Sequence, residues 1–198
     1  MPKSFTQITT DHDGQMVFTS SQDSITNFLS GPMITNYAGI CLALVMIWLS
    51  QDSCKKSPLK GIVNKTRALA LQGSMESNWN GFSTVENQGT TVINKHFWWK
   101  STQMESLLTG DPDVYLQNDP KNKRDGLHIF VLYFPSGPAH GIGVWRFPTT
   151  AVVLYDPNEG ACVQSSGKFK GFLTEFIKEI YPKATHFAVC SWYSDPTG

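Results

Sequence analysis

The sequence predicts an α+β fold, in which a helical N-terminal half is followed by a mostly antiparallel sheet with one inserted helix. Three observations lead to this prediction. The segments 39–50 and 59–75 carry their apolar residues in helical patterns. From Leu127 onward, short segments rich in β-branched and aromatic residues are separated by Gly, Pro or Thr. Near the C-terminus, 169–180 returns to helical spacing before a last strand.

The composition is that of a folded protein with one main domain. The chain has 198 residues, of which 40% are hydrophobic and 16% are charged, so it can bury a full core. The first thirty residues are polar; we expect 1–30 to form an arm or a short hairpin and 31–198 to form the domain. Lys and Arg number 16, as do Asp and Glu, and this balance disfavours nucleic acid as a partner.

Three helices are expected in the N-terminal half. Before them, "QITTDHDGQMVFTS" is typical of two short strands around an Asp-Gly turn, or of a mobile arm. The apolar run 39–50 predicts a buried helix, and "LKGIVNKTRALALQ" begins a second that extends to about Met75. The segment "KHFWWKSTQMESLLTGD" predicts a third helix, which ends at Gly110 before the loop "NDPKNKRDG".

The C-terminal half is expected to be mainly sheet. The segments "LHIFVLYF", "AHGIGVWRF" and "AVVLYD" predict neighbouring antiparallel strands. An amphipathic helix follows in "KFKGFLTEFIKEIYP", where Pro182 ends it, and "THFAVCSW" predicts the last strand.

Membrane, zinc and redox roles are disfavoured by simple counts. The apolar run Gly39–Leu49 has eleven residues, whereas a membrane-spanning helix needs about 20. The N-terminus lacks the apolar stretch of a secretory signal, so we expect a cytosolic protein or one exported by another route. The four cysteines are scattered without a CxxC pair, so we expect no metal and no organic cofactor. They are Cys41, Cys54, Cys162 and Cys190.

Cys41 lies in the first turn of the predicted buried helix. Free backbone N–H groups and the positive end of the helix dipole stabilise a thiolate there, and the thiolate is the form of cysteine that attacks carbonyl carbon. The position therefore suits a nucleophile. A small buried hydrophobe is the other interpretation of the same residue.

A nucleophilic thiolate needs a base, and His140 has the most suitable surroundings among the five histidines. It opens a strand after "SGP" and is followed by Gly141 and Gly143, which leave one strand face without side chains. The other histidines lie in the polar arm, in the Trp-rich middle and in apolar strands: His12, His96, His128 and His186.

Antiparallel pairing brings a carboxylate to this histidine. If residues 147–149 form the tip of the hairpin, His140 is directly opposite Asp156 on the face that packs on the core. An Asp beside an imidazole fixes which nitrogen carries the proton. Asp156 in "DPNEG" is equally typical of a residue that starts a turn. The remaining pairs of this register are Ile142 with Leu154, Val144 with Val152, and Arg146 with Thr150.

These three residues carry a resemblance to a known family. Cys41 in "GICLALVMIWL", His140 in "AHGIGV" and Asp156 in "YDPNEG" resemble the triad of the YopT-type (AvrPphB-like) cysteine proteases, a papain-like effector family. The resemblance covers three short blocks and the order of elements after Leu127. It implies a papain-like catalytic domain over 31–198, with Cys41 as nucleophile, His140 as base and Asp156 as the residue that orients His140. It also implies an oxyanion hole from Asn36 and the Cys41 backbone N–H.

The family implies a biological setting as well. Its members are bacterial effectors, which are secreted without a Sec signal and act on host proteins in the cytoplasm of the host cell. A host protein substrate is therefore expected, with a secretion chaperone as a further partner. OspI-like effectors have the same order of Cys, His and Asp but deamidate a glutamine, so a protein glutamine deamidase is the alternative activity. A non-enzymatic interaction module is the alternative from another class.

Overall fold

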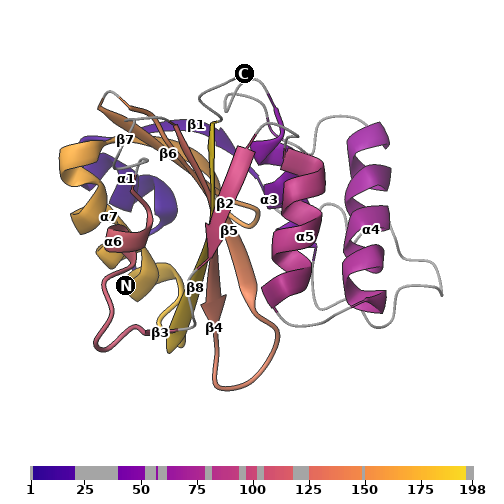
Figure 1. Cartoon of the computed structure of the whole chain (residues 1–198). Coiled ribbons are helices and arrows are strands. Elements are labelled where there is room, and N and C mark those ends of the chain that lie inside the picture. The colour runs from indigo at the N-terminus through magenta and orange to yellow at the C-terminus, as the bar shows by residue number, and fades with distance from the viewer. Residues whose placement is uncertain are drawn as a thin grey trace.

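The chain folds around an antiparallel sheet with helices on both faces, which confirms the predicted α+β class (Figure 1). The strand order is β1-β7-β6-β5-β4-β8-β2, and β3 pairs with the first residues of β8 on the edge that β2 pairs with further along. Helices α3, α4 and α5 lie on one side of the sheet, and α1, α6 and α7 lie on the other. This computed structural model describes residues 2–20, 40–51, 57, 62–78, 82–93, 97–101, 105–117, 125–148 and 150–194.

The element boundaries follow the chain. The helices are α1 (Phe5–Asp11), α3 (Cys41–Leu49), α4 (Ile62–Ser77), α5 (Phe82–Ile93), α6 (Pro112–Tyr115) and α7 (Ser166–Ile180). The strands are β1 (Gln15–Thr19), β2 (Phe97–Ser101), β3 (Glu105–Ser106), β4 (Gly126–Tyr133), β5 (His140–Arg146), β6 (Ala151–Asp156), β7 (Gly160–Ser165) and β8 (His186–Ser194).

Helix α3 is buried on every side, as its uniformly apolar sequence predicts. It packs between the sheet and the helices α4 and α5, and each of its nine residues is buried. Trp48, which is fully buried, contacts Tyr155 and Trp145 of the sheet at ring-centroid distances of 5.2 and 6.4 Å. Truncation of such a side chain to Ala costs about 3–5 kcal/mol, so α3 is fixed in the centre of the fold.

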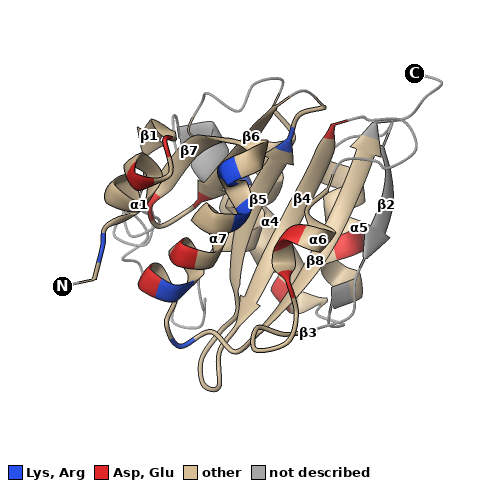
Figure 2. Cartoon of the chain, turned by 90° about the vertical axis from the view of Figure 1, so that its left-hand side faces the viewer, with Lys and Arg blue, Asp and Glu red and all other residues tan. Residues whose placement is uncertain are grey.

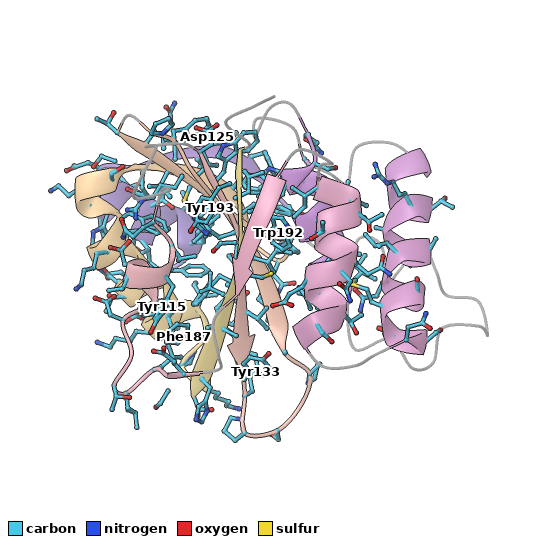
Figure 3. The ribbon with its side chains drawn as sticks, in the orientation of Figure 1. Tyr115, Asp125, Tyr133, Phe187, Trp192 and Tyr193 are labelled. Atoms are coloured by element: carbon cyan, nitrogen blue, oxygen red, sulfur yellow. The ribbon has the colours of Figure 1, made fainter. Side chains whose placement is uncertain are left out.

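The opposite face of the sheet has an aromatic core under an amphipathic helix. Phe169, Phe172 and Phe176 of α7 are buried and face the sheet, with Phe5 of α1 packed against them. Figure 3 shows the two faces: Trp192 of β8 lies toward α5, where its Nε1 donates to Thr90 Oγ1 at 3.1 Å, whereas Phe187 lies beside Tyr115 on the other side. Successive side chains of β8 point to opposite faces of the sheet, so this strand contributes residues to both cores.

Several element predictions are wrong. Residues 5–11 form helix α1, because Ser4 caps it with a side-chain hydrogen bond to the Gln7 N–H, where the sequence predicted a strand. The predicted helix up to Gly110 is replaced by β2 and β3, since Phe97, Trp98 and Trp99 favour a strand that pairs with β8. Helix α5 and strand β7 were not predicted. The division at residue 30 stays a prediction.

The hairpin of β5 and β6 has a register two residues away from the predicted one. Val144 pairs with Leu154 and Arg146 with Val152. Phe147 pairs with Ala151, whose carbonyl accepts the Phe147 N–H at 3.0 Å, so the turn lies one residue further along the chain than predicted. Phe147 thereby continues the pairing of the hairpin, where its ring stacks on that of Trp145 at a centroid distance of 5.4 Å, instead of lying at the tip of the turn.

Charged residues on the α7 side are mixed in sign (Figure 2). Lys3 bridges Asp11 and Glu175, which ties α1 to α7, and Lys170 pairs with Asp111 beside α6. In the part of the chain that the structure describes, no helix is both long and apolar enough to cross a membrane.

Candidate active site

The sulfur of Cys41 lies at the head of α3, where the helix meets the start of β5. Its Sγ accepts the backbone N–H of Gly141 at 3.3 Å and lies 4.0 Å from the Ala139 carbonyl oxygen. The residue is buried, with 6% of its surface exposed. Only the residues on either side of His140 make these contacts, so the thiol is placed directly beside the predicted base.

Two glycines allow α3 to approach β5 this closely. A Cβ at Gly141 would lie 2.5 Å from Leu42 Cδ2, and a Cβ at Gly143 would lie 2.8 Å from Trp48 Cε3. Real Cβ atoms do not make such contacts, so a side chain at either position would displace the helix. The bare strand face predicted from the sequence is therefore the surface on which the nucleophile's helix rests.

His140 joins the two sides of the site. It is the first residue of β5 and is buried. Its Nε2 lies 3.2 Å from Asp156 Oδ1 and 2.8 Å from the Tyr181 hydroxyl. The same ring is coupled to Cys41 by hydrogen bonding and charge, which shift the pKa values of both groups. Since Nε2 faces Asp156 and Tyr181, Nδ1 is the nitrogen left for the sulfur. The imidazole thus has one nitrogen toward sulfur and the other toward a carboxylate.

Asp156 ends β6 and begins the turn "DPNEG", so both predicted uses of this residue coexist. Its Oδ1 accepts the backbone N–H of Asn158 at 2.7 Å, which is an Asx turn. Gly160 closes the turn with φ of +123°, a conformation that favours glycine. The carboxylate has no solvent exposure. Because the register differs from the predicted one, Asp156 lies diagonally across from His140, and the two side chains are long enough to meet.

The electrostatics favour a charged pair. Burial by itself would raise the pKa of Cys41, but its hydrogen bond and charge interaction with His140 outweigh burial, and the thiol's pKa is lowered. Burial likewise opposes protonation of His140, yet the charge and hydrogen bond of Asp156, with Cys41, raise the pKa of the imidazole. Thiolate and imidazolium therefore coexist between these two pKa values.

The other described cysteines have the opposite character. Burial raises the pKa of Cys162 to about 12, and burial also raises the pKa of Cys190. Such thiols are inert structural residues. Cys54 lies outside the described residues. Of the described cysteines, Cys41 is therefore the one whose pKa is lowered.

The other described histidines make their contacts outside this site. Burial lowers the pKa of His128 to about 3, and its Nδ1 is 2.7 Å from Ser191 Oγ. His12 pairs with Glu175, and His186 contacts Thr185. His96 falls outside the described residues.

One predicted residue cannot be placed, and two contacting residues were not predicted. Asn36, proposed for the oxyanion hole, lies outside the described residues. Tyr181 and Asn158 complete the hydrogen bonds around Asp156. Tyr181 follows α7 immediately before Pro182, and no local sequence pattern distinguishes it from a packing residue.

The assembled groups can perform nucleophilic acyl chemistry. A thiolate, an imidazole within hydrogen-bond reach and a carboxylate that orients the imidazole are the parts of a thiol hydrolase site. Among the residues that the structure describes, no group of three or more His, Cys, Asp or Glu side chains could hold a metal ion.

Comparison with solved structures found chains that are similar to this one. AvrPphB, an avirulence protein of Pseudomonas, superposes with a TM-score of 0.53 at 18% identity, covering 85% of this chain and 99% of that chain. Two further matches are weaker. PatoxP, a cysteine protease-like domain of the Photorhabdus asymbiotica toxin PaTox, has a TM-score of 0.40 at 12% identity, covering 86% of this chain and 52% of that chain. The YopT domain of the Pasteurella multocida PfhB2 toxin has 0.32 at 14%, covering 88% and 90%.

The sequence itself gives no such match. No family model matches the chain, and no curated protein matches it in a sequence search. Of the three structures, AvrPphB carries the fold assignment, because its superposition extends over nearly the whole of that protein.

Proposed function

Because the chain has the AvrPphB-like, papain-like fold, we propose that it is a cysteine protease that acts on a protein substrate. One observation carries the proposal. The buried His140 lies between Cys41, with which it interacts by hydrogen bonding and charge, and Asp156, whose Oδ1 is 3.2 Å from its Nε2. A histidine between a thiol of lowered pKa and a fully buried carboxylate is what covalent thiol catalysis requires.

In the proposed reaction, the Cys41 thiolate attacks the carbonyl carbon of the scissile amide. The new C–S bond forms as the carbonyl π pair moves to oxygen. The amide C–N bond then breaks, and the imidazolium of His140 gives its proton to the leaving amine. Neutral His140 next removes a proton from water, the hydroxide attacks the acyl-thioester, and the C–S bond breaks to return the thiolate.

Asp156 orients the imidazole and stabilises its charged form in this scheme. For the oxyanion, we propose the backbone N–H of Cys41, a first-turn donor that the helix itself does not use. Asn36 is the proposed second donor, on the strength of the sequence resemblance alone.

The biological setting is proposed from the same resemblance. We infer a bacterial effector, secreted without a Sec signal and acting on a host protein in the host cytoplasm, with a chaperone for secretion. AvrPphB, the fold neighbour, is itself a Pseudomonas avirulence protein. A translocation assay with a reporter fused to the chain tests this inference, and retention of the reporter in the bacterium would contradict it.

Intact mass spectrometry tests the reaction. Candidate host proteins are incubated with the wild-type protein and with Cys41→Ala, and new fragments are expected only with the wild type. A gain of about one dalton per site would instead mean glutamine deamidation through the same acyl-thioester. If Cys41→Ser preserves every phenotype in the host, the interaction module replaces the enzyme.

A further inference from the structure

The hydroxyl of Tyr181 is closer to Nε2 of His140 than the carboxylate of Asp156 is. The Nε2 of His140 lies 2.8 Å from the Tyr181 hydroxyl, compared with 3.2 Å from Asp156 Oδ1. The same hydroxyl donates its proton to Asp156 Oδ2 at 2.6 Å. Its oxygen therefore accepts the proton on Nε2, which fixes the imidazole in the tautomer that leaves Nδ1 for Cys41.

We propose that Tyr181 is a positioning residue for the catalytic histidine, through whose hydroxyl Asp156 holds the imidazole. This inference rests on the proposed function and adds a fourth member to its constellation. Asp156 contacts the ring of His140 in two ways. One is the direct bond of 3.2 Å to Nε2, and the other passes through the Tyr181 hydroxyl, whose two bonds are 2.8 and 2.6 Å long. The route through the phenol has the better distances.

The surroundings of Tyr181 hold its ring in one place. Its ring lies 4.9 Å from that of His140 and 5.6 Å from that of Phe176, measured between centroids. Its N–H caps the end of α7 by donating to Ile177 at 2.9 Å. Asn158 Nδ2 approaches the hydroxyl at 3.4 Å as a second donor. A side chain fixed in this way can set the orientation of its neighbour.

The phenol remains a neutral donor in the working range of pH. Burial raises the pKa of Tyr181 far above its ordinary value, and the charge and hydrogen bond of Asp156 raise it further, as does the charge of Glu159. The groups that face His140 are Cys41 on α3, Asp156 and Glu159 at the end of β6, and Tyr181 after α7.

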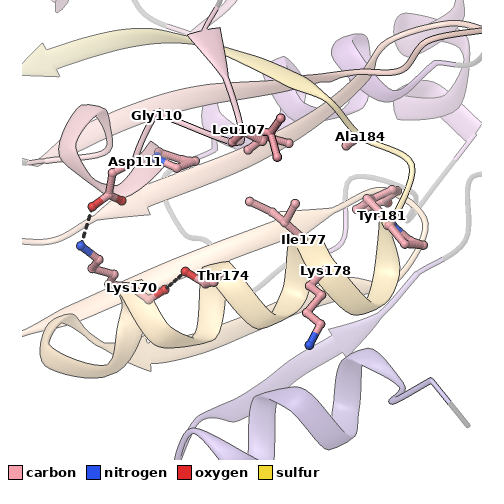
Figure 4. Close-up of a pocket in the computed structure, with 12 residues that line it drawn as sticks. Leu107, Gly110, Asp111, Lys170, Thr174, Ile177, Lys178, Tyr181 and Ala184 are labelled. Atoms are coloured by element: carbon pink, nitrogen blue, oxygen red, sulfur yellow. Dashed lines mark hydrogen bonds and ion pairs between the residues drawn. The ribbon is translucent and has the colours of Figure 1, made fainter.

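One edge of Tyr181 borders a cavity. The cavity has a volume of about 470 Å³ and is lined by Leu107, Asp111, Lys170, Ile177 and Ala184, among others. Figure 4 shows Tyr181 at one end of the cavity, beyond the last turn of α7. The ring is thus packed on the side of His140 and Phe176, so Tyr181→Phe removes the hydroxyl without removing the packing.

The test measures the alkylation rate of Cys41 by iodoacetamide from pH 4 to 9, with peptide mass spectrometry. It needs no knowledge of the substrate, and Cys162 and Cys190 act as slow internal references. For Tyr181→Phe we expect the midpoint to move upward by about half a unit to one unit, since a weaker hold on the imidazolium weakens the thiolate. Tyr115→Phe, which loses a hydroxyl bonded to Glu105, is the matched control and should overlay the wild type.

Each result has one meaning. A wild-type Cys41 that labels like an ordinary thiol contradicts the proposed function and this inference together. An activated wild type that Tyr181→Phe leaves unchanged contradicts this inference alone. If Tyr181→Phe lowers Tm strongly, 3-fluorotyrosine at position 181 replaces it. The proton resonance on His140 Nε2 should then shift in NMR, and an unmoved resonance would overturn the proposal.

Discussion

The two faces of the sheet contribute to the site in different ways. On the α3 face, an entirely apolar helix rests on a strand that is bare at Gly141 and Gly143, and this packing locates the helix that carries the thiol. On the α7 face, the imidazole and the carboxylate are located by directed hydrogen bonds with Tyr181 and Asn158. The position of Cys41 therefore depends mainly on packing, whereas the positions of His140 and Asp156 depend on hydrogen bonds.

The difference predicts how each face responds to change. A packed face tolerates little added volume, because its neighbours have nowhere to move. A hydrogen-bonded face tolerates the loss of a bond only where the group left behind finds another partner, because an unsatisfied buried polar group costs about 1–3 kcal/mol. The variants below separate these two behaviours.

The largest effect is expected from His140→Ala. Without the imidazolium, burial dominates and the pKa of Cys41 rises, so the thiolate at pH 6 falls to about 1% or less. We expect the iodoacetamide labelling rate of Cys41 at pH 6 to fall by about tenfold or more. Circular dichroism should show an unchanged fold. A rate equal to that of the wild type would contradict the ion pair.

Gly143→Ala tests the packed face. Its Cβ would lie 2.8 Å from the buried Trp48 ring and 3.2 Å from Val45, so we expect a loss of about 1–3 kcal/mol in unfolding free energy. Gly167→Ala on α7 is the matched control, because its Cβ would meet nothing within 4 Å and alanine favours a helix. Differential scanning calorimetry should show a lower Tm for the first variant only. Equal Tm values would mean that α3 is loosely held.

Asp156→Asn tests the polar face with a smaller expected effect. Loss of the carboxylate charge lowers the pKa of His140, which weakens the thiolate and raises the pKa of Cys41. The pH window of the ion pair should narrow from both ends, since the thiolate is lost earlier as pH falls and the imidazolium is lost earlier as pH rises. We expect labelling at pH 6 to fall by about three- to tenfold. A wild-type profile would show that Asp156 serves only the turn.

The smallest effect is expected from Lys170→Ala. The ion pair of Lys170 with Asp111 is exposed, and exposed pairs contribute little to stability. Tm and the labelling profile should both equal those of the wild type. A drop of several degrees would show that the cavity beside α7 depends on this pair.

Burial patterns made much of the fold predictable. The uniformly apolar run at α3 has no plausible place outside a core, and the strands β4, β5, β6 and β8 carry β-branched residues between turn residues. The segment 97–110 was misread because its aromatic residues fit either element, and pairing with β8 is a long-range contact that a local pattern does not contain.

The meeting of His140 and Asp156 was predicted from a register that is wrong by two residues. The prediction that they meet holds because side chains alternate with a period of two, so a shift of two keeps both on their original face. The shift itself depends on which residues form the turn, which the sequence between Phe147 and Ala151 does not reveal. The catalytic roles of these residues stay a prediction.

Tyr181 could not be predicted at all. Its hydroxyl reaches His140 across 41 positions of sequence, because α7 ends beside the start of β5. The packing of Phe169, Phe172 and Phe176 on the sheet places the end of α7 there. The residue type alone is common in cores and has no spacing that points to a triad.

A sulfur enclosed at the head of α3 selects its reagents by size. With 6% of Cys41 exposed, a slender electrophile reaches the sulfur more readily than a probe that carries a bulky reporter beside its reactive group. Surveys of reactive cysteines that use large maleimide tags will therefore under-report this protein. Small haloacetamides with the reporter attached afterwards are the reagents that its geometry recommends.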